Sequence, residues 1–186
     1  MNTLRAKALH ARRRMHVDER HDASQKICRR FTRSAIFLSS HAIGCYLPAY
    51  DEVDTLPIIE RAWCANKRIF VPVLRKRYKM LFREMRPDTP LEKNDYDIWE
   101  PTNGAFLSPR KLDAVSAPTV AFDDENNRIG MGGGYFDRCF AYLRHRRIWL
   151  RPKLVGLAFD CQRVKRISAR PWDIPLYRVF TDGGSI

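Results

Sequence analysis

The sequence predicts an α/β domain of three layers, with helices on both sides of a mostly parallel central sheet. Short apolar runs alternate with helical stretches along the 186 residues, and a strand–helix–strand unit lies between residues 42 and 73. This length suits one domain with a single sizeable core, and 45% of the residues are hydrophobic. We therefore expect residues 1–186 to form one domain, with the helices of residues 1–34 packed on it.

The N-terminal region predicts two basic helices, because residues 3–34 contain neither Gly nor Pro. A break is expected near residues 16–18, where Asp18 can cap the second helix. The first helix has only a thin apolar stripe. Its consecutive Arg12, Arg13 and Arg14 therefore indicate a solvated helix face rather than ligands.

The next segment predicts a parallel β-α-β unit. Residues 42–47 (AIGCYL) form a short apolar run that stops at Pro48, as expected of a buried strand. A helix follows at residues 55–65, with Thr55 as N-cap and Pro57 in its first turn. Residues 68–73 (RIFVPV) are the second strand.

The remaining segments continue the alternation. Strands are expected at residues 80–85, 112–120, 153–158 and 177–181, the second of them despite the internal Pro118. A turn is expected at residues 123–127, a helix at 136–143, and a long connection with four prolines at 86–113. In such sheets ligands bind beyond the carboxyl ends of the strands.

Composition limits the class of protein. No apolar run approaches the roughly 20 residues that cross a bilayer, and the basic N-terminus lacks the apolar stretch of a signal peptide. A cytoplasmic protein is the expectation, with a transit peptide over residues 1–15 as the competing interpretation. The five cysteines form no CxxC pair, which favours reduced thiols over a zinc or disulfide site.

The net charge of +13 is concentrated in two segments. Residues 1–35 carry ten Lys and Arg against three acidic residues, and residues 144–170 carry nine against one. These segments could serve a nucleic-acid-binding module, which is one alternative function. Because the rest of the chain is slightly acidic, they fit anionic small ligands better, and we expect no specific nucleic acid and no membrane partner.

A glycine-rich turn is the most informative motif. Four of the nine glycines fall within residues 130–134, followed by Asp137 and preceded by Arg128. Glycines let a backbone approach a ligand closely, and successive N–H groups before a helix can bind a phosphate. A carboxylate beside that phosphate is a plausible Mg²⁺ ligand. The alternative is a flexible strand-to-helix turn without a ligand.

The motifs in combination resemble a known family. The segment AFDDENNRIGMGGGYFDR is similar to the signature of the 5-formyltetrahydrofolate cyclo-ligases, also called methenyltetrahydrofolate synthetases. The stretches LRAKALHARRRM, GCYLPAYDEVDTLPIIERAW, RIFVPV, IWEP and PWDIPL resemble the same family in the same order. The resemblance covers nearly the whole chain. It implies a Rossmann-like fold, similar in architecture to the sugar-phosphate isomerases and CoA-transferase-like proteins.

The resemblance implies a defined reaction. Members use ATP and Mg²⁺ to close 5-formyltetrahydrofolate into 5,10-methenyltetrahydrofolate, releasing ADP and phosphate through a phosphorylated formyl intermediate. Phosphoryl transfer of this kind needs alignment and charge neutralisation. A monomer acting on a folate with or without a polyglutamate tail is expected. A sugar-phosphate isomerase-like enzyme is the second alternative function, on fold analogy alone.

The resemblance also assigns residues. It gives Glu52, near the reacting formyl group, and Tyr135 as catalytic residues, and Asp137 and Asp173 as Mg²⁺ ligands. ATP contacts fall on Arg5, Arg128, Ile129, Gly130, Met131, Gly132, Gly133, Gly134, Tyr135 and Phe136. Folate contacts fall on Leu47, Glu52, Met80, Trp99 and the segment Met131, Gly132, Gly133, Gly134 and Tyr135. Trp99 could instead be an ordinary core residue, Glu52 a plain turn carboxylate, and Asp173 a residue that caps a turn before Pro175.

Two departures from the family pattern concern charge. The position of a usual N-terminal lysine, four residues before Arg5, is Met1. Many relatives carry a cation at the position of Met131 or Gly133, whereas this turn has none. Arg128, Arg138 and the basic stretch 144–170 would have to supply the charge.

Overall fold

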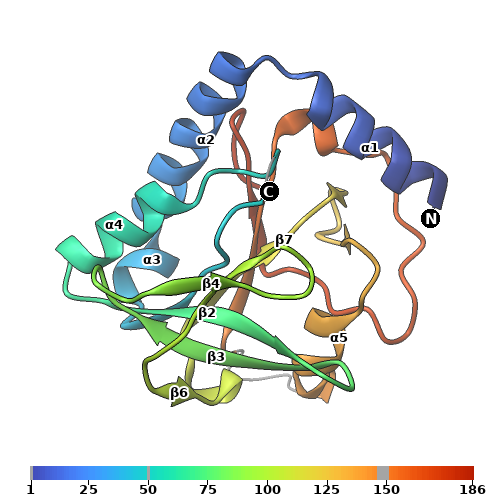
Figure 1. Ribbon diagram of the computed structural model, residues 1–186. Helices are drawn as coiled ribbons and strands as arrows, with labels where there is room; N and C mark the ends of the chain where they lie inside the picture. The colour runs from blue at the N-terminus through green and yellow to red at the C-terminus, as the bar shows by residue number, and fades with distance from the viewer. Residues whose placement is uncertain (1, 50, 146–150) are drawn as a thin grey trace.

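The computed structural model describes residues 2–49, 51–145 and 151–186. Its centre is a seven-stranded sheet in the order β11-β10-β7-β1-β2-β3-β6 (Figure 1). The strands from β11 to β2 are parallel, β3 is antiparallel to β2, and β6 is antiparallel to β3. In chain order they are Ala42–Gly44 (β1), Arg68–Arg75 (β2), Lys79–Met85 (β3), Phe106–Leu107 (β6), Ala114–Pro118 (β7), Lys153–Leu157 (β10) and Arg178–Phe180 (β11).

Helices cover both faces of this sheet and complete the predicted three layers. One face carries α2 (Val17–Thr32), α3 (Ala35–Ser39) and α4 (Leu56–Cys64), which Figure 1 shows together on one side. The buried Phe31 of α2 packs its ring edge-on against Phe37 and Phe180. The other face carries α5 (Tyr135–Cys139) and the 3₁₀ turn η2 (Ala141–His145), where the buried Phe140 packs against Phe82. The three-layer α/β prediction is confirmed.

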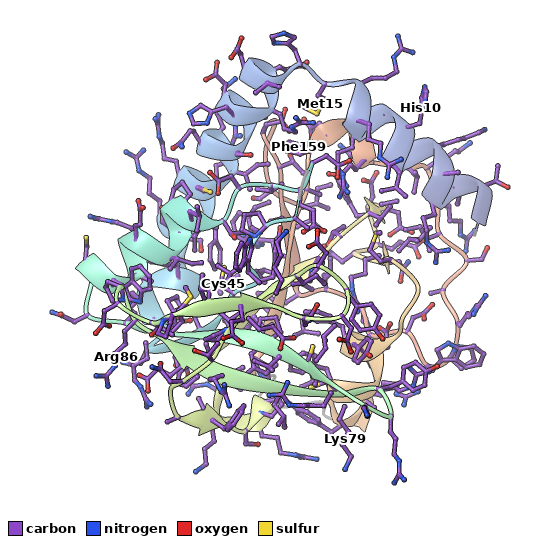
Figure 2. The ribbon with its side chains drawn as sticks, viewed as in Figure 1. His10, Met15, Cys45, Lys79, Arg86 and Phe159 are labelled. Atoms are coloured by element: carbon purple, nitrogen blue, oxygen red, sulfur yellow. The ribbon has the colours of Figure 1, made fainter. Side chains whose placement is uncertain are left out.

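The first helix, α1 (Asn2–Arg14), packs away from the central sheet. It covers a small hairpin of β8 (Ala121–Phe122) and β9 (Arg128–Ile129) and the 3₁₀ turn η3 (Asp160–Gln162), with Ala8 buried against Ile129. Figure 2 shows His10 pointing outward from α1, while Cys45 lies inside the molecule. The break between α1 and α2 falls where expected, but His16 rather than Asp18 is the N-cap, because its imidazole accepts from Asp18 N.

Several local predictions need correction. The long connection at residues 86–113 contains the hairpin of β4 (Leu91–Lys93) and β5 (Trp99–Pro101) and the 3₁₀ turn η1 (Pro109–Lys111). The helix expected at 136–143 ends at Cys139 and tightens into η2 after the buried Phe140. Thr55 is the N-cap of α4, but its hydroxyl donates to Tyr46 O at 2.6 Å rather than capping. No helix in the described ranges is long and apolar enough to cross a bilayer.

Candidate active site

A buried carboxylate organises the hairpin that leads into the glycine turn. Asp123 is 1% exposed and accepts hydrogen bonds from the backbone N–H groups of Asn127 (2.9 Å) and Ile167 (2.8 Å). It therefore fixes the β8–β9 turn and ties it to the segment after η3. The sequence predicted a turn here but not this role, for which the only signal was an Asp in an Asp/Asn-rich turn.

The glycine turn, residues 130–134, begins directly after β9 and is largely exposed. Gly132 and Gly134 have φ values of 107° and 66°, which favour glycine. Gly134 also approaches the guanidinium of Arg138, and a Cβ there would lie 2.8 Å from Arg138 Nη1. The following α5 has only five residues, so its dipole contributes less charge than the sequence suggested. Side-chain cations therefore contribute more of the positive charge at this turn than the helix dipole does.

Arg5 crosses from α1 to the glycine turn. Its Nε donates to Gly130 O at 2.9 Å across 125 residues of sequence. Its guanidinium also lies over Gly132, 3.6 Å from the position that a Cβ would take there. The contact places a positive charge at one end of the turn, as the assigned nucleotide role of Arg5 requires.

Arg128 forms an ion pair with Asp137. Its Nη2 donates to Asp137 Oδ1 at 2.9 Å, and the Arg128 side chain is 5% exposed. The same carboxylate oxygen accepts from Ile174 N at 3.1 Å. The positive charge of Arg128 is therefore largely neutralised, and the pair joins the glycine turn to the loop that contains Asp173.

The two assigned metal ligands lie on this pair of segments. Asp173 accepts from Arg170 N through Oδ2 at 2.8 Å and is the residue before Ile174, which contacts Asp137. Among the described residues no donor reaches Oδ2 of Asp137 or Oδ1 of Asp173. No cluster of three or more His, Cys, Asp or Glu side chains occurs in the described ranges. The donor set fits Mg²⁺, which takes one or two carboxylates and fills its remaining positions with phosphate oxygens and water.

A cavity of about 370 Å³ lies beside the glycine turn. Such a volume is typical of small-ligand sites. Its walls come from α1, from the loop after β1 and from the turn itself: Arg12, Arg13, Ala49, Asp51, Glu52 and Met131. The structure thus brings the predicted Glu52 and Met131 to one hollow.

Glu52 has a perturbed environment in this cavity. Burial raises the pKa of its carboxyl above the usual value, although the Ala49 N–H and the charge of Arg12 act in the opposite direction. The Ala49 N–H donates to Glu52 Oε2 at 3.2 Å. A partly buried acid in a cleft beside a phosphate-type turn is a candidate functional group.

Arg12 corrects the prediction that the three consecutive arginines form a solvated face. It is 4% exposed and donates to Asp51 Oδ1 at 2.8 Å, while Arg13 and Arg14 are exposed as expected. Burial alone would raise the pKa of the Asp51 carboxyl, but the hydrogen bond and charge of Arg12 reverse this and lower it. The residue next to Glu52 is therefore anchored to α1.

Replacing Asp51 by Asn is expected to destabilise the fold by about 2–4 kcal/mol at neutral pH, because the buried Arg12 loses its counter-charge. The lowered pKa of Asp51 gives stability that is present above the unfolded pKa and is lost as the pH falls through the folded pKa. The difference from wild type should therefore shrink in acid. Urea unfolding at several pH values measures this, and a pH-independent difference would contradict it.

Three tyrosines form a cluster at the far end of the glycine turn, with Tyr78 and Tyr96 exposed and Tyr135 partly buried. The ring of Tyr135 lies 5.8 Å from that of Tyr78 and 6.4 Å from that of Tyr96, centre to centre. The hydroxyls of Tyr135 and Tyr96 are 3.3 Å apart, and this hydrogen bond, more than burial, raises the pKa of Tyr135. The sequence predicted Tyr135 but not the other two, which come from the β2–β3 turn and the β4–β5 loop.

The other predicted residues are spread around this centre. Leu47 and Met80 are buried, Leu47 after β1 and Met80 at the start of β3 opposite Leu74. Trp99 is 44% exposed on β5, with Lys93 over its ring, so it is not an ordinary core residue. Ile129 is buried under α1, and Phe136 packs against Phe140 behind the turn. No described contact joins Trp99 to the glycine turn.

Comparisons with known proteins identify the family of this chain. The profile of the 5-formyltetrahydrofolate cyclo-ligase family matches residues 1–182. Proteins named 5-formyltetrahydrofolate cyclo-ligase are 33% identical over 174 residues in Escherichia coli (91% of this chain, 93% of that protein) and 32% identical over 165 residues in Haemophilus influenzae (87% and 86%).

A solved structure gives the same result for the fold. The 5,10-methenyltetrahydrofolate synthetase of Aquifex aeolicus superposes with a TM-score of 0.84 at 28% identity, covering 99% of this chain and 90% of that one. Sequence and structure thus match over nearly the whole length. The chain therefore belongs to the 5-formyltetrahydrofolate cyclo-ligase family, a family of ligases.

Proposed function

We propose that this enzyme uses ATP and Mg²⁺ to cyclise 5-formyltetrahydrofolate to 5,10-methenyltetrahydrofolate, with release of ADP and phosphate. The observation that carries the proposal is the cavity that joins Glu52 to Met131 of the glycine turn, beside the Arg5 contact with the same turn. This arrangement offers an acid for the folate in the cavity and a phosphate-binding turn for the nucleotide at its edge, where Met131 lines the cavity.

The chemistry explains why both ligands must share a site. The formyl oxygen attacks the γ-phosphorus and ADP leaves, which converts a poor leaving group into a phosphate ester. The neighbouring folate nitrogen then adds to the formyl carbon and loses its proton, and inorganic phosphate leaves with the former formyl oxygen. Both steps depend on alignment and on stabilisation of phosphate charge rather than on a protein nucleophile.

The residues take complementary parts in this proposal. The backbone N–H groups of residues 130–134 and the guanidinium of Arg5 bind phosphate oxygens. Glu52 lies next to the formyl group, and its raised pKa suits proton exchange there. Tyr135 borders both ligands. Asp137 and Asp173 would hold Mg²⁺, which when bound neutralises phosphate charge.

The proposal also covers the cellular compartment, the oligomeric state and the form of the folate substrate. Five free thiols suit a reducing cytoplasm, and we propose that the enzyme acts as a monomer. The exposed Arg13, at the cavity, and the basic surface of residues 151–170 would attract a polyglutamate tail. Comparing mono- and triglutamylated substrate at low and high salt tests this last point, since screening removes such attraction.

Turnover tests the proposal directly. Purified protein mixed with 5-formyltetrahydrofolate, ATP and Mg²⁺ should produce the near-ultraviolet absorbance of the methenyl product, with one ADP per product. Reactions without ATP or with a chelator of divalent cations are the controls. A folded preparation that forms no ATP-dependent product would contradict the proposal.

A further inference from the structure

The glycine turn contains no cation of its own, so its phosphate-binding charge has to come from neighbouring side chains. Three arginines contact the turn or border it: Arg5, Arg128 and Arg138. Arg128 is ion-paired with Asp137 and nearly buried, which leaves it little net charge to offer. Arg5 lies at the Gly130–Gly132 end. The opposite end of the turn depends on Arg138.

Arg138 is held against the turn by contacts that leave its charge uncompensated. Its Nη1 donates to Gly133 O at 2.8 Å, and its guanidinium lies 4.2 Å from the centre of the Tyr78 ring. Neither partner is an anion. Among the described residues no carboxylate lies within ion-pairing distance of Arg138. A guanidinium fixed between a carbonyl and an aromatic face remains available to bind an anion.

The surrounding backbone accommodates this guanidinium. A side chain at Gly134 would collide with Arg138 Nη1, so the glycine there makes room for it. Tyr78 has a φ of 57°, which is unusual for a bulky residue and places its ring at the end of the β2–β3 turn, beside Tyr135. Two segments distant in sequence thus hold one cation over the C-terminal end of the turn.

We infer that Arg138 is a phosphate-binding residue for the nucleotide and supplies the cation that the turn lacks. The inference rests on the proposed function, because it assigns a residue to the same nucleotide site. Arg5 and Arg138 then contact the turn from its two ends, with the backbone N–H groups between them. A bidentate guanidinium is well matched to phosphate oxygens.

The variants Arg138→Gln and Arg138→Lys distinguish the contribution of the Arg138 charge to MgATP binding from that of its structural contacts. Glutamine keeps a donor for Gly133 O but loses the charge, whereas lysine keeps the charge. Arg110→Gln is a matched control, because the Arg110 guanidinium lies 4.1 Å from the centre of the Tyr142 ring and so also makes a cation–π contact. Binding of MgATP is measured by calorimetry, and KM values for ATP and for the folate are measured in the turnover assay.

We expect Arg138→Gln to weaken MgATP binding about tenfold or more, the effect of losing one hydrogen bond to a charged group. In Arg138→Gln the KM for ATP should rise in parallel, while the KM for the folate changes little. Arg138→Lys should recover part of the lost MgATP affinity, and Arg110→Gln should bind MgATP as wild type does. Wild-type MgATP affinity in Arg138→Gln, or equal losses in Gln and Lys with a lowered melting temperature, would overturn the inference. If the wild-type protein binds MgATP but forms no product, the proposed reaction is contradicted and the inference about Arg138 is not. If the wild-type protein binds no MgATP, the proposed reaction and the inference about Arg138 are both contradicted.

Discussion

Asp137→Ala is expected to lower kcat by at least about 100-fold, the scale seen when one group that stabilises transition-state charge is removed, because Asp137 would hold the Mg²⁺ that neutralises phosphate charge. The same variant should also unfold more easily. Its carboxylate is the counter-charge of the nearly buried Arg128, and a buried ion pair that loses one partner is destabilised by about 3 kcal/mol. The activity of the Ala variant therefore mixes two effects.

Asp137→Asn separates the loss of charge from the loss of structure. The amide oxygen can still accept from Arg128 Nη2 and Ile174 N, as Asp137 Oδ1 does. We expect the Asn variant to be more stable than the Ala variant and still to lose most of its turnover. Thermal melting and the Mg²⁺ dependence of kcat check this. An Asn variant with wild-type kcat would remove Asp137 from the metal site.

Glu52→Gln is the second substitution that we expect to have a large effect on turnover. We expect turnover to fall by about 100-fold or more, the contribution typical of a positioned acid or base. The variant should nevertheless melt at a higher temperature than wild type at neutral pH. Burial raises the pKa of this carboxyl, so the folded state holds its ionised form at a cost that an amide of the same shape avoids.

The pH dependence of this gain follows from the sign of the shift. A raised folded pKa gives wild-type stability that is present below the unfolded pKa and is lost as the pH rises through the folded pKa. The advantage of Gln should thus be largest at neutral pH and vanish in acid. Asp54→Asn is the control, because the carboxylate of Asp54 accepts from Leu56 N at the start of α4, and the variant should keep wild-type turnover. A Gln variant that is less stable at neutral pH would contradict the assigned environment.

The fold was predictable where the pattern was strong. The β1–α4–β2 unit follows from two apolar runs around a capped helix, and β7 was identified despite Pro118, which occupies its last position. The β8–β9 hairpin was missed because each strand has two residues, too few for a period to show. Likewise α3 has five residues and lies directly after α2.

Candidate site residues were predictable only where they lie in a motif that resembles the family signature. The glycine turn, Glu52 and Arg5 were assigned from the resemblance, and the structure brings them to one region. Arg12 was misjudged because its burial depends on Asp51, 39 residues away, and no periodicity reports such a pairing. Tyr78 and Tyr96 lie in loops whose approach to Tyr135 is fixed by the whole sheet.

The position of α1 links ligand binding to folding. This helix buries few apolar side chains, so its docking contributes little to stability by itself and it is expected to open more readily than the central sheet. Yet Arg5 and Arg12 complete the site from that helix. A nucleotide that binds only the closed arrangement must therefore stabilise it, by RT ln(1 + [L]/Kd). The docking of α1 and the binding of nucleotide are therefore expected to be coupled, so that α1 should open less often as the nucleotide concentration rises.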